Sequence, residues 1–120
     1  MLDSEYDLAV FELDCRAKDI RDAKRPAYTI GSKDVLNNFK TVADRVGIDP
    51  RQVWLVYFLK HVDAITSAAK DPNIPQAEAL LDRFADAINY LHLGWAIVSE
   101  ESKTQTFRRG NIYDSPLPPF

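Results

Sequence analysis

The chain is 120 residues long, 46% hydrophobic and 28% charged, which suits one folded domain and excludes a chain that is disordered throughout. Its formal net charge of −3 excludes a general coat for DNA, and a single cysteine excludes an internal disulfide. The longest apolar run, residues 53–59, is far shorter than the roughly 20 residues that span a bilayer. The acidic N-terminus has no secretory signal pattern. We therefore expect a cytoplasmic protein with neither a membrane nor a nucleic acid as its partner.

A first helix is predicted over residues 4–24, because apolar residues there step by four and three positions and share one face. These residues are Tyr6, Val10, Leu13, Ala17 and Ile20. We expect Pro26 to end this helix, because proline lacks the N–H that a helix interior needs. Residues 26–32 then form a loop, and Ser32 is expected to cap the N-terminus of the next helix.

Two further helices are predicted on either side of Gly47, which suits the left-handed C-cap of the helix before it. The apolar positions of that second helix are Val35, Phe39, Val42 and Val46. The third helix begins with Asp49 as N-cap and Pro50 at the first helical position, and Gln52 completes a capping box. Residues 53–69 are apolar on most sides, which is typical of a central helix with neighbours around it.

A fourth helix is predicted over residues 76–102, after a turn at residues 71–75. Its main apolar seam consists of Ala77, Leu81, Phe84, Ile88, Leu91, Trp95 and Val98. Residues 103–120 contain three prolines, which favour an extended C-terminal arm. The sequence therefore predicts an all-α fold, with a four-helix, bundle-like single domain over residues 1–102 followed by this arm.

Acidic residues repeat every four positions on the fourth helix. Glu78, Asp82 and Asp86 share a face, and Asn89 follows one turn later. Such a carboxylate group suits a hard cation such as Mg²⁺, and a solvated acidic face is the alternative. The same face continues through apolar residues 93, 96 and 97, so we expect Asp86 and Asn89 to lie near a buried edge.

A second polar group lies on the third helix. Lys60 is placed to meet a phosphate, and Asp63 to join the carboxylates of the fourth helix; an ordinary ion pair between the two is the alternative. His61 is a weaker ligand candidate, as is His92, because a histidine on a mostly apolar helix is more often a core residue.

Basic residues concentrate between residues 16 and 40, where seven Lys or Arg stand against three Asp. Lys24, Arg25 and Lys33 flank a loop that leads into a helix N-terminus, where free N–H groups favour anions. Tyr28 is placed to stack on a base, and Asn38 to reach a ligand. There is no Walker-type glycine loop, no HExxH motif and no nucleophile elbow, so no catalytic residue is assigned.

Three segments together resemble a known family. Residues 31–39 are similar to a "YG…NF" segment, residues 53–61 to a lysine-bearing helix, and residues 82–90 to a "D…D..NY" helix. All three occur in small phage-encoded, MazG-like all-α proteins related to nucleoside triphosphate pyrophosphohydrolases. The resemblance covers about residues 24 to 98.

This resemblance implies a homo-oligomer, a dimer or a tetramer, with a nucleotide site between helices. The metal ligands of the active enzymes come from an EExxE helix and an ExxD-like helix. Only the second carries over, as Asp82 and Asp86 with Glu78 just before them, while Lys60 and Asp63 stand where the glutamates are expected. Nucleotide binding without hydrolysis is the expectation, because hydrolysis needs several acidic ligands to hold Mg²⁺.

Our first hypothesis is a phage-type protein of the host-cell cytoplasm that sequesters a nucleotide signal used in host defence, without cleaving it and without a cofactor. Its ligand-binding residues would be Lys24, Arg25, Tyr28, Lys33, Asn38, Lys60, His61 and Asn89. The second hypothesis is a Mg²⁺-dependent nucleoside triphosphate pyrophosphohydrolase with its metal at Asp63, Glu78, Asp82 and Asp86. The third is a non-enzymatic protein that inhibits a partner protein through the arm or an exposed helix.

Overall fold

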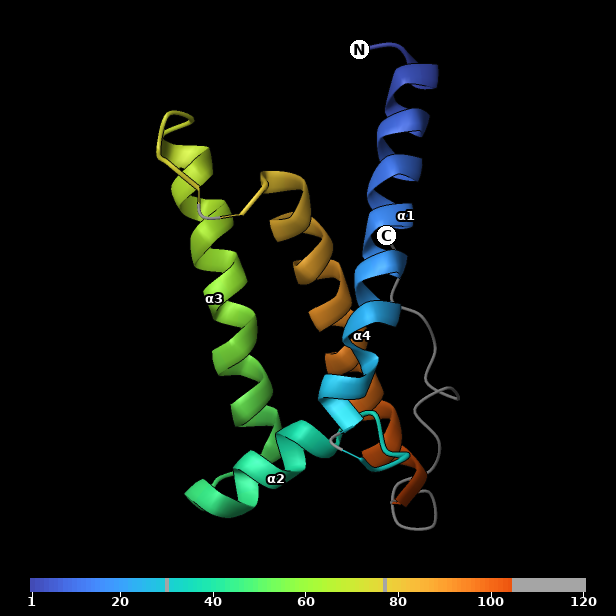
Figure 1. The fold of residues 1–120 in the computed structure, drawn as a ribbon, viewed down its shortest axis with the longest axis vertical. Helices are drawn as coiled ribbons and strands as arrows, with labels where there is room; N and C mark the ends of the chain where they lie inside the picture. Colours follow the sequence, from blue (N-terminus) through green and yellow to red (C-terminus); the bar gives the residue numbers. More distant parts are fainter. Residues whose placement is uncertain (30, 77, 105–120) are drawn as a thin grey trace, which may run out of the picture.

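The structure, a computed structural model, describes residues 1–29, 31–76 and 78–104, and four α-helices make up most of them. They are α1 (Asp3–Thr29), α2 (Asn37–Val46), α3 (Pro50–Lys70) and α4 (Leu80–Thr104). The helix α4 packs against α1 on one side and α3 on the other, and the short α2 crosses the lower end of the molecule between α1 and α3 (Figure 1). The prediction of an all-α fold is confirmed. Among the described residues no helix is long and apolar enough to cross a membrane.

Local signals set the ends of α2 and α3 as predicted. Gly47 adopts φ 79°, and its N–H donates to the carbonyl oxygen of Ala43. The Asp49 carboxylate accepts from the N–H of Arg51 at 2.8 Å, while the Gln52 side chain accepts from the N–H of Asp49 at 3.0 Å. A capping box of this kind satisfies N–H groups that the first helical turn leaves without partners.

Two boundaries predicted around the first loop are wrong. Pro26 lies inside α1, which continues to Thr29, and the Thr29 hydroxyl donates to the carbonyl oxygen of Pro26 at 3.1 Å. One missing N–H in the last turns costs a single hydrogen bond, which this helix tolerates. Ser32 does not cap α2, because its hydroxyl accepts from the N–H of Asp34, whose own carboxylate accepts from the N–H of Leu36. These two bonds fold residues 32–36 as a turn, so α2 begins only at Asn37.

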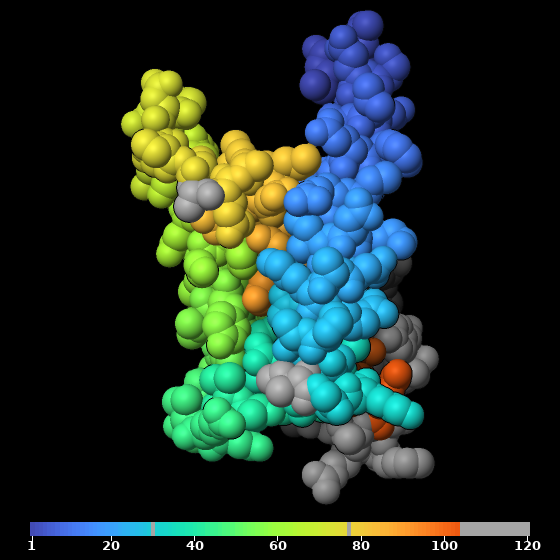
Figure 2. Space-filling model, viewed as in Figure 1, coloured from blue at the N-terminus to red at the C-terminus, as the bar shows by residue number. Residues whose placement is uncertain are grey.

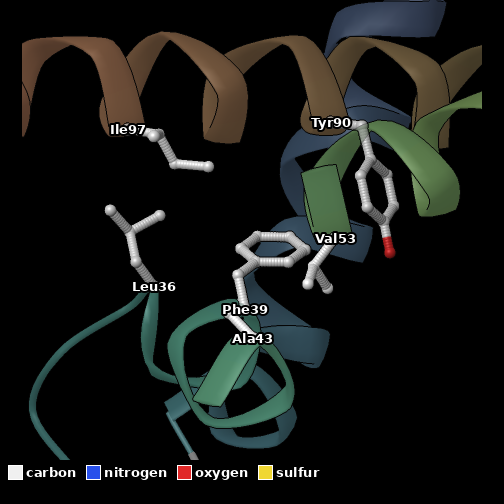
Figure 3. Packing of buried hydrophobic residues seen from close by; sticks show 6 residues of the cluster. All are labelled: Leu36, Phe39, Ala43, Val53, Tyr90 and Ile97. Atoms are coloured by element: carbon white, nitrogen blue, oxygen red, sulfur yellow. The ribbon is translucent and has the colours of Figure 1, made fainter. Parts of the chain in front are cut away.

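The hydrophobic core lies at the lower end of the molecule, where α2 meets α3 and α4. Phe39 has no exposed surface, and its ring sits at the centre of the cluster (Figure 3). The other members of this cluster are Leu36, Ala43, Val53, Tyr90 and Ile97. Beside it, the indole N–H of Trp54 donates to the carbonyl oxygen of Tyr90 at 2.6 Å, which fixes α3 against α4.

The apolar seam predicted on the fourth helix is largely exposed, and its first residue, Ala77, lies outside the described residues. Phe84, Leu91, Trp95 and Val98 are all exposed. The buried positions are instead Ala85, Asp86, Asn89, Tyr90 and Ile97. Residues 55, 56 and 59 of α3 are exposed as well, so α3 is not the central helix, and α4 takes that place (Figure 1).

The first half of α1 stands clear of the rest of the molecule (Figures 1 and 2). Every residue from 1 to 12 is exposed, and the first fully buried position of the helix is Ala17. At the other end of the chain, α4 begins at Leu80 rather than at residue 76, and it continues through residues 103 and 104. The remainder of the predicted arm, residues 105–120, lies outside the described residues.

Candidate functional site

A cleft of about 180 Å³ opens between the second half of α1 and the middle of α4. Its basic wall is formed by Arg21, Lys24 and Arg25 of α1. Spacings of three and four residues place these side chains along one side of the helix, with Tyr28 one turn further on. The remaining wall is formed by apolar side chains and by His92, the weaker ligand candidate of the fourth helix; the apolar residues are Ile20, Val35, Leu93 and Ala96.

Asp86 is a buried carboxylate at one edge of this cleft. It is 3% exposed, and the Nζ atom of Lys24 donates to its Oδ1 at 3.2 Å. Its Oδ2 lies 3.8 Å from Nδ1 of His61, which is too long for a hydrogen bond. Burial lowers the pKa of His61 from its ordinary value, and the Asp86 charge opposes that shift only in part. His61 is therefore neutral at pH 7, and Lys24 is the main partner of the Asp86 carboxylate.

Asn89 is the second buried polar side chain in the cleft, with 6% of its surface exposed. Its amide nitrogen donates to the carbonyl oxygen of Ala17 at 2.8 Å. That bond fixes the orientation of the amide, because a carbonyl oxygen accepts only from the nitrogen. The Asn89 Oδ1 then has no hydrogen-bond partner among the described residues. A buried acceptor in this state favours a ligand that carries an N–H or O–H group.

Tyr28 lines the cleft, and the buried Tyr90 lies beside it. The rings of Tyr28 and Tyr90 meet edge to face with their centres 6.3 Å apart. Burial raises the pKa of both hydroxyls, so both stay protonated throughout the physiological range. Tyr28 also packs 6.2 Å from the ring of Phe39, so the core holds it in place. Part of its ring is left to line the cleft.

The structure brings together half of the predicted ligand-binding residues. Lys24, Arg25, Tyr28 and Asn89 all line the cleft. The other four, Lys33, Asn38, Lys60 and His61, do not line it. Lys33 and Lys60 are exposed elsewhere, whereas His61 packs on the far side of Asp86 against the ring of Tyr90.

The predicted metal ligands do not lie together in the structure. Arg16 holds Asp82 through two hydrogen bonds of 2.7 and 3.1 Å, and this pairing lowers the Asp82 pKa. Glu78 lies 4.0 Å from Arg83, and Asp63 is exposed on α3. Among the described residues, no three acidic, histidine or cysteine side chains stand close enough together to hold a metal ion. The face of α4 that carries Asp82 and Asp86 meets the cations of α1 instead.

Two arginines of α1 were missed by the sequence interpretation. Arg21 lines the cleft and Arg16 pairs with Asp82. The four-residue spacing of Arg21 and Arg25 was a visible signal for a shared face. No comparable signal existed for Arg16, whose partner lies 66 residues away in the chain.

Comparison of the chain with protein-family models, with curated proteins and with solved structures finds no match.

Proposed function

We propose that the cleft between α1 and α4 binds a small nucleotide, with its phosphate on the basic wall and its base against Tyr28 and the apolar wall. The observation that carries this proposal is the meeting, in one cleft, of three basic side chains with Asn89, whose Oδ1 has no hydrogen-bond partner among the described residues. A nucleotide combines an anion, a flat apolar ring and N–H donors, so it satisfies all three parts of the cleft.

The basic wall carries positive charge that strong ion pairs do not neutralise and that is available to a phosphate. Lys24 forms an ion pair with the buried Asp86. Arg25 has a single ion-pair contact among the described residues, 3.9 Å from Asp22, and it contributes little because both side chains are exposed. Arg21 makes no ion pair within 4 Å in the part of the chain that the structure describes. Two guanidinium groups one turn apart suit phosphate oxygens, which they bind in a bidentate manner.

The size of the cleft limits how much of the ligand it holds. A volume of about 180 Å³ is below the roughly 300 Å³ at which ordinary small-molecule sites begin. In this proposal the base lies between Tyr28 and the apolar wall formed by Leu93 and Ala96, and one of its N–H groups donates to Asn89. The phosphates then lie at the open side, along the arginines.

Binding without cleavage is supported by the pairing of the carboxylates. Both Asp82 and Asp86 form ion pairs with α1, and a metal would have to displace Arg16 and Lys24 to reach them. A protein of this kind lowers the free concentration of its ligand. The sequestering of a nucleotide signal, suggested by the resemblance to phage-encoded MazG-like proteins, is part of this proposal.

Calorimetric titration with mono-, tri- and cyclic nucleotides, with and without Mg²⁺, tests the proposal. The Arg21→Gln/Arg25→Gln variant is expected to bind at least about tenfold more weakly, because a charge-assisted hydrogen bond contributes roughly 1.5–3 kcal/mol. The matched control is Arg45→Gln, which removes an exposed arginine of α2 far from the cleft lining and leaves affinity unchanged. Chromatography of each sample afterwards is expected to recover the nucleotide intact.

Equal affinity of the double variant and the wild type contradicts the assignment of this cleft. Conversion of a triphosphate to a monophosphate only when Mg²⁺ is present establishes the pyrophosphohydrolase instead. Absence of binding across the whole panel contradicts any nucleotide function for the protein.

A further inference from the structure

An apolar groove of about 730 Å³ lies between α3 and α4, and it shares no lining residue with the cleft among the described residues. Both tryptophans of the chain line this groove, Trp54 from α3 and Trp95 from α4. Leu55, Leu91, Ile97 and Val98 line it as well. Trp95 and Leu91 are each 54% exposed, so the groove presents aromatic and aliphatic surface that favours burial.

The charged residues of the groove lie at the N-terminal end of α3. Asp49 and Arg51 both line it, and they form an ion pair in which Nε lies 3.3 Å from Oδ1. An uncharged segment that docks beside this pair leaves no charge without a partner. The groove therefore suits an apolar occupant better than a charged one.

The described part of α4 ends beside the same groove. The Nε atom of Arg51 lies 3.3 Å from Oε1 of Glu101, and Thr104, the last described residue, follows Glu101 within one helical turn. Val98 lies six residues before Thr104, about 9 Å back along the helix. Residues 105–114, fully extended, span up to roughly 33 Å, so the sequence after them can turn back along α4 and reach the groove.

Residues 115–120 have the sequence of a polyproline segment. They read Ser-Pro-Leu-Pro-Pro-Phe, in which Pro116 and Pro119 have P-x-x-P spacing and no side chain is charged. Proline fixes its own φ, so such a sequence favours the polyproline II helix in advance and loses little entropy when it binds. Proline-rich segments of this kind dock in grooves that aromatic side chains line.

We propose that residues 115–120 dock in the α3/α4 groove of their own chain, as a polyproline II segment that packs against Trp95. Four residues in this conformation span about 12 Å, and α4 rises about 11 Å from Leu91 to Val98, the part of the helix that lines the groove. A linker of about ten residues holds a segment near its site at an effective concentration of roughly millimolar order. The tether therefore favours this segment over a free partner, and the inference does not depend on the nucleotide proposal.

A nitroxide label beside the segment tests the proposal in the full chain. Cys15, the only cysteine, is exposed, so Cys15→Ser is expected to leave the fold intact and Tyr113→Cys then carries a single label. In ¹⁵N-labelled protein we expect paramagnetic broadening at the amides of residues 51–55 and 91–95. The amides of residues 3–12, at the far end of α1, are expected to keep their intensity (Figure 1).

The same label in a chain with Pro116→Ser/Pro118→Ser/Pro119→Ser gives the decisive comparison. We expect the broadening at residues 51–55 and 91–95 to be lost, because this sequence no longer favours polyproline II. The matched control, Pro72→Ser/Pro75→Ser, removes prolines from the turn between α3 and α4 and is expected to keep the broadening. Equal broadening with and without the segment prolines overturns the proposal, as does broadening centred on residues 20–28.

A mixture of two preparations distinguishes docking within one chain from docking between copies. Nitroxide-labelled chain at natural isotope abundance is added to ¹⁵N-labelled chain that carries no nitroxide. We expect no broadening of the ¹⁵N-labelled chain, because each segment occupies its own groove. Broadening at residues 51–55 or 91–95 in this mixture overturns docking within the chain.

Tryptophan fluorescence is an independent measurement, because both tryptophans line the groove. The triple proline variant is expected to emit at a longer wavelength than the wild type, since Trp95 loses its cover and gains contact with water. The control variant is expected to emit as the wild type does. An emission maximum that is the same in the triple variant and the wild type contradicts the contact with Trp95.

Discussion

The chemistry of the cleft depends on which side chains lie next to Asp86. A carboxylate that is 3% exposed loses most of its hydration, and Lys24 compensates for that loss from 3.2 Å. His61, also buried, lies on the other side of the carboxylate, and its Nδ1 has no hydrogen-bond partner among the described residues. These three groups from α1, α3 and α4 are coupled, so protonation of one affects the stability of the whole arrangement.

The lowered pKa of His61 predicts that stability falls as the pH is lowered from 7 to 5. The unfolded chain takes up a proton near the ordinary pKa of 6.5, whereas the folded protein resists it, so the unfolded state binds more protons in this range. The free energy of unfolding therefore decreases, by at most about 1.4 kcal/mol per pH unit for one proton. The charged groups that act on His61 are Asp86, Lys24, Arg83 and Lys60. Urea denaturation at a series of pH values measures the effect.

His61→Leu is expected to remove most of this dependence, because leucine has no proton to gain. Ion pairs and hydrogen bonds lower the pKa values of several carboxylates, so these groups titrate below pH 5 and do not contribute to the slope between pH 7 and 5. They are Asp22, Asp34, Asp49 and Asp82. A His61→Leu variant with the full wild-type slope would show that His61 is not the group responsible.

At the scale of the elements, the helix α4 organises the molecule because each of its sides has a different neighbour. One side meets the basic residues of α1, the next packs on Trp54 and the α2 core, and the third forms the wall of the groove. Gly94 makes the second contact possible, since a Cβ atom there would lie 2.5 Å from the Trp54 ring. The indole cannot retreat, because its N–H is bonded to the carbonyl oxygen of Tyr90.

Gly94→Ala is therefore expected to destabilise the protein, although alanine is the better helix former. The helical preference contributes about 1 kcal/mol in favour of alanine, while overpacking costs about 1–3 kcal/mol. The difference is a net loss of up to about 2 kcal/mol, measured as a lower midpoint in urea. In a Trp54→Leu background, where the ring is absent, the same change is expected to be neutral or stabilising. A stabilising effect of Gly94→Ala in the wild type would contradict the close contact.

Helix ends with a single strong local signal could be predicted from the sequence, whereas the ends near Pro26 and Ser32 could not, because local hydrogen bonds there form in a different pattern. The caps at Gly47 and Asp49 are local, and both predictions are confirmed. The strongest apolar stripe of α4 did not indicate its orientation, because that stripe is largely exposed while a stripe containing Asp86 and Asn89 is buried. The burial of these two residues was expected from the apolar residues that follow them. An apolar stripe marks a helix surface that favours burial. It does not identify which segment, if any, packs against that surface.

At the scale of the whole molecule, the cleft joins residues that are far apart in the chain. The bond between Lys24 and Asp86 spans 62 positions, and the bond between Ala17 and Asn89 spans 72. The sequence identified both ligand candidates, Lys24 and Asn89, by residue type, but it placed Asp86 in a metal group and Lys60 near the phosphate. The structure differs from the predicted metal group because the carboxylates of α4 form ion pairs with α1. Asp82 pairs with Arg16, and Asp86 pairs with Lys24.

The central claim is that a nucleotide binds in the cleft between α1 and α4. Chemical-shift mapping of ¹⁵N-labelled protein during titration with ATP and with cyclic AMP tests this claim most directly. We predict changes at the backbone amides of residues 20–28 and 86–96 and at the side-chain amide of Asn89, which lines the cleft. The amides near Lys60 on α3 are predicted to stay unchanged. Shifts centred on Lys60 or on the first half of α1, or no shifts at millimolar nucleotide, would contradict the account.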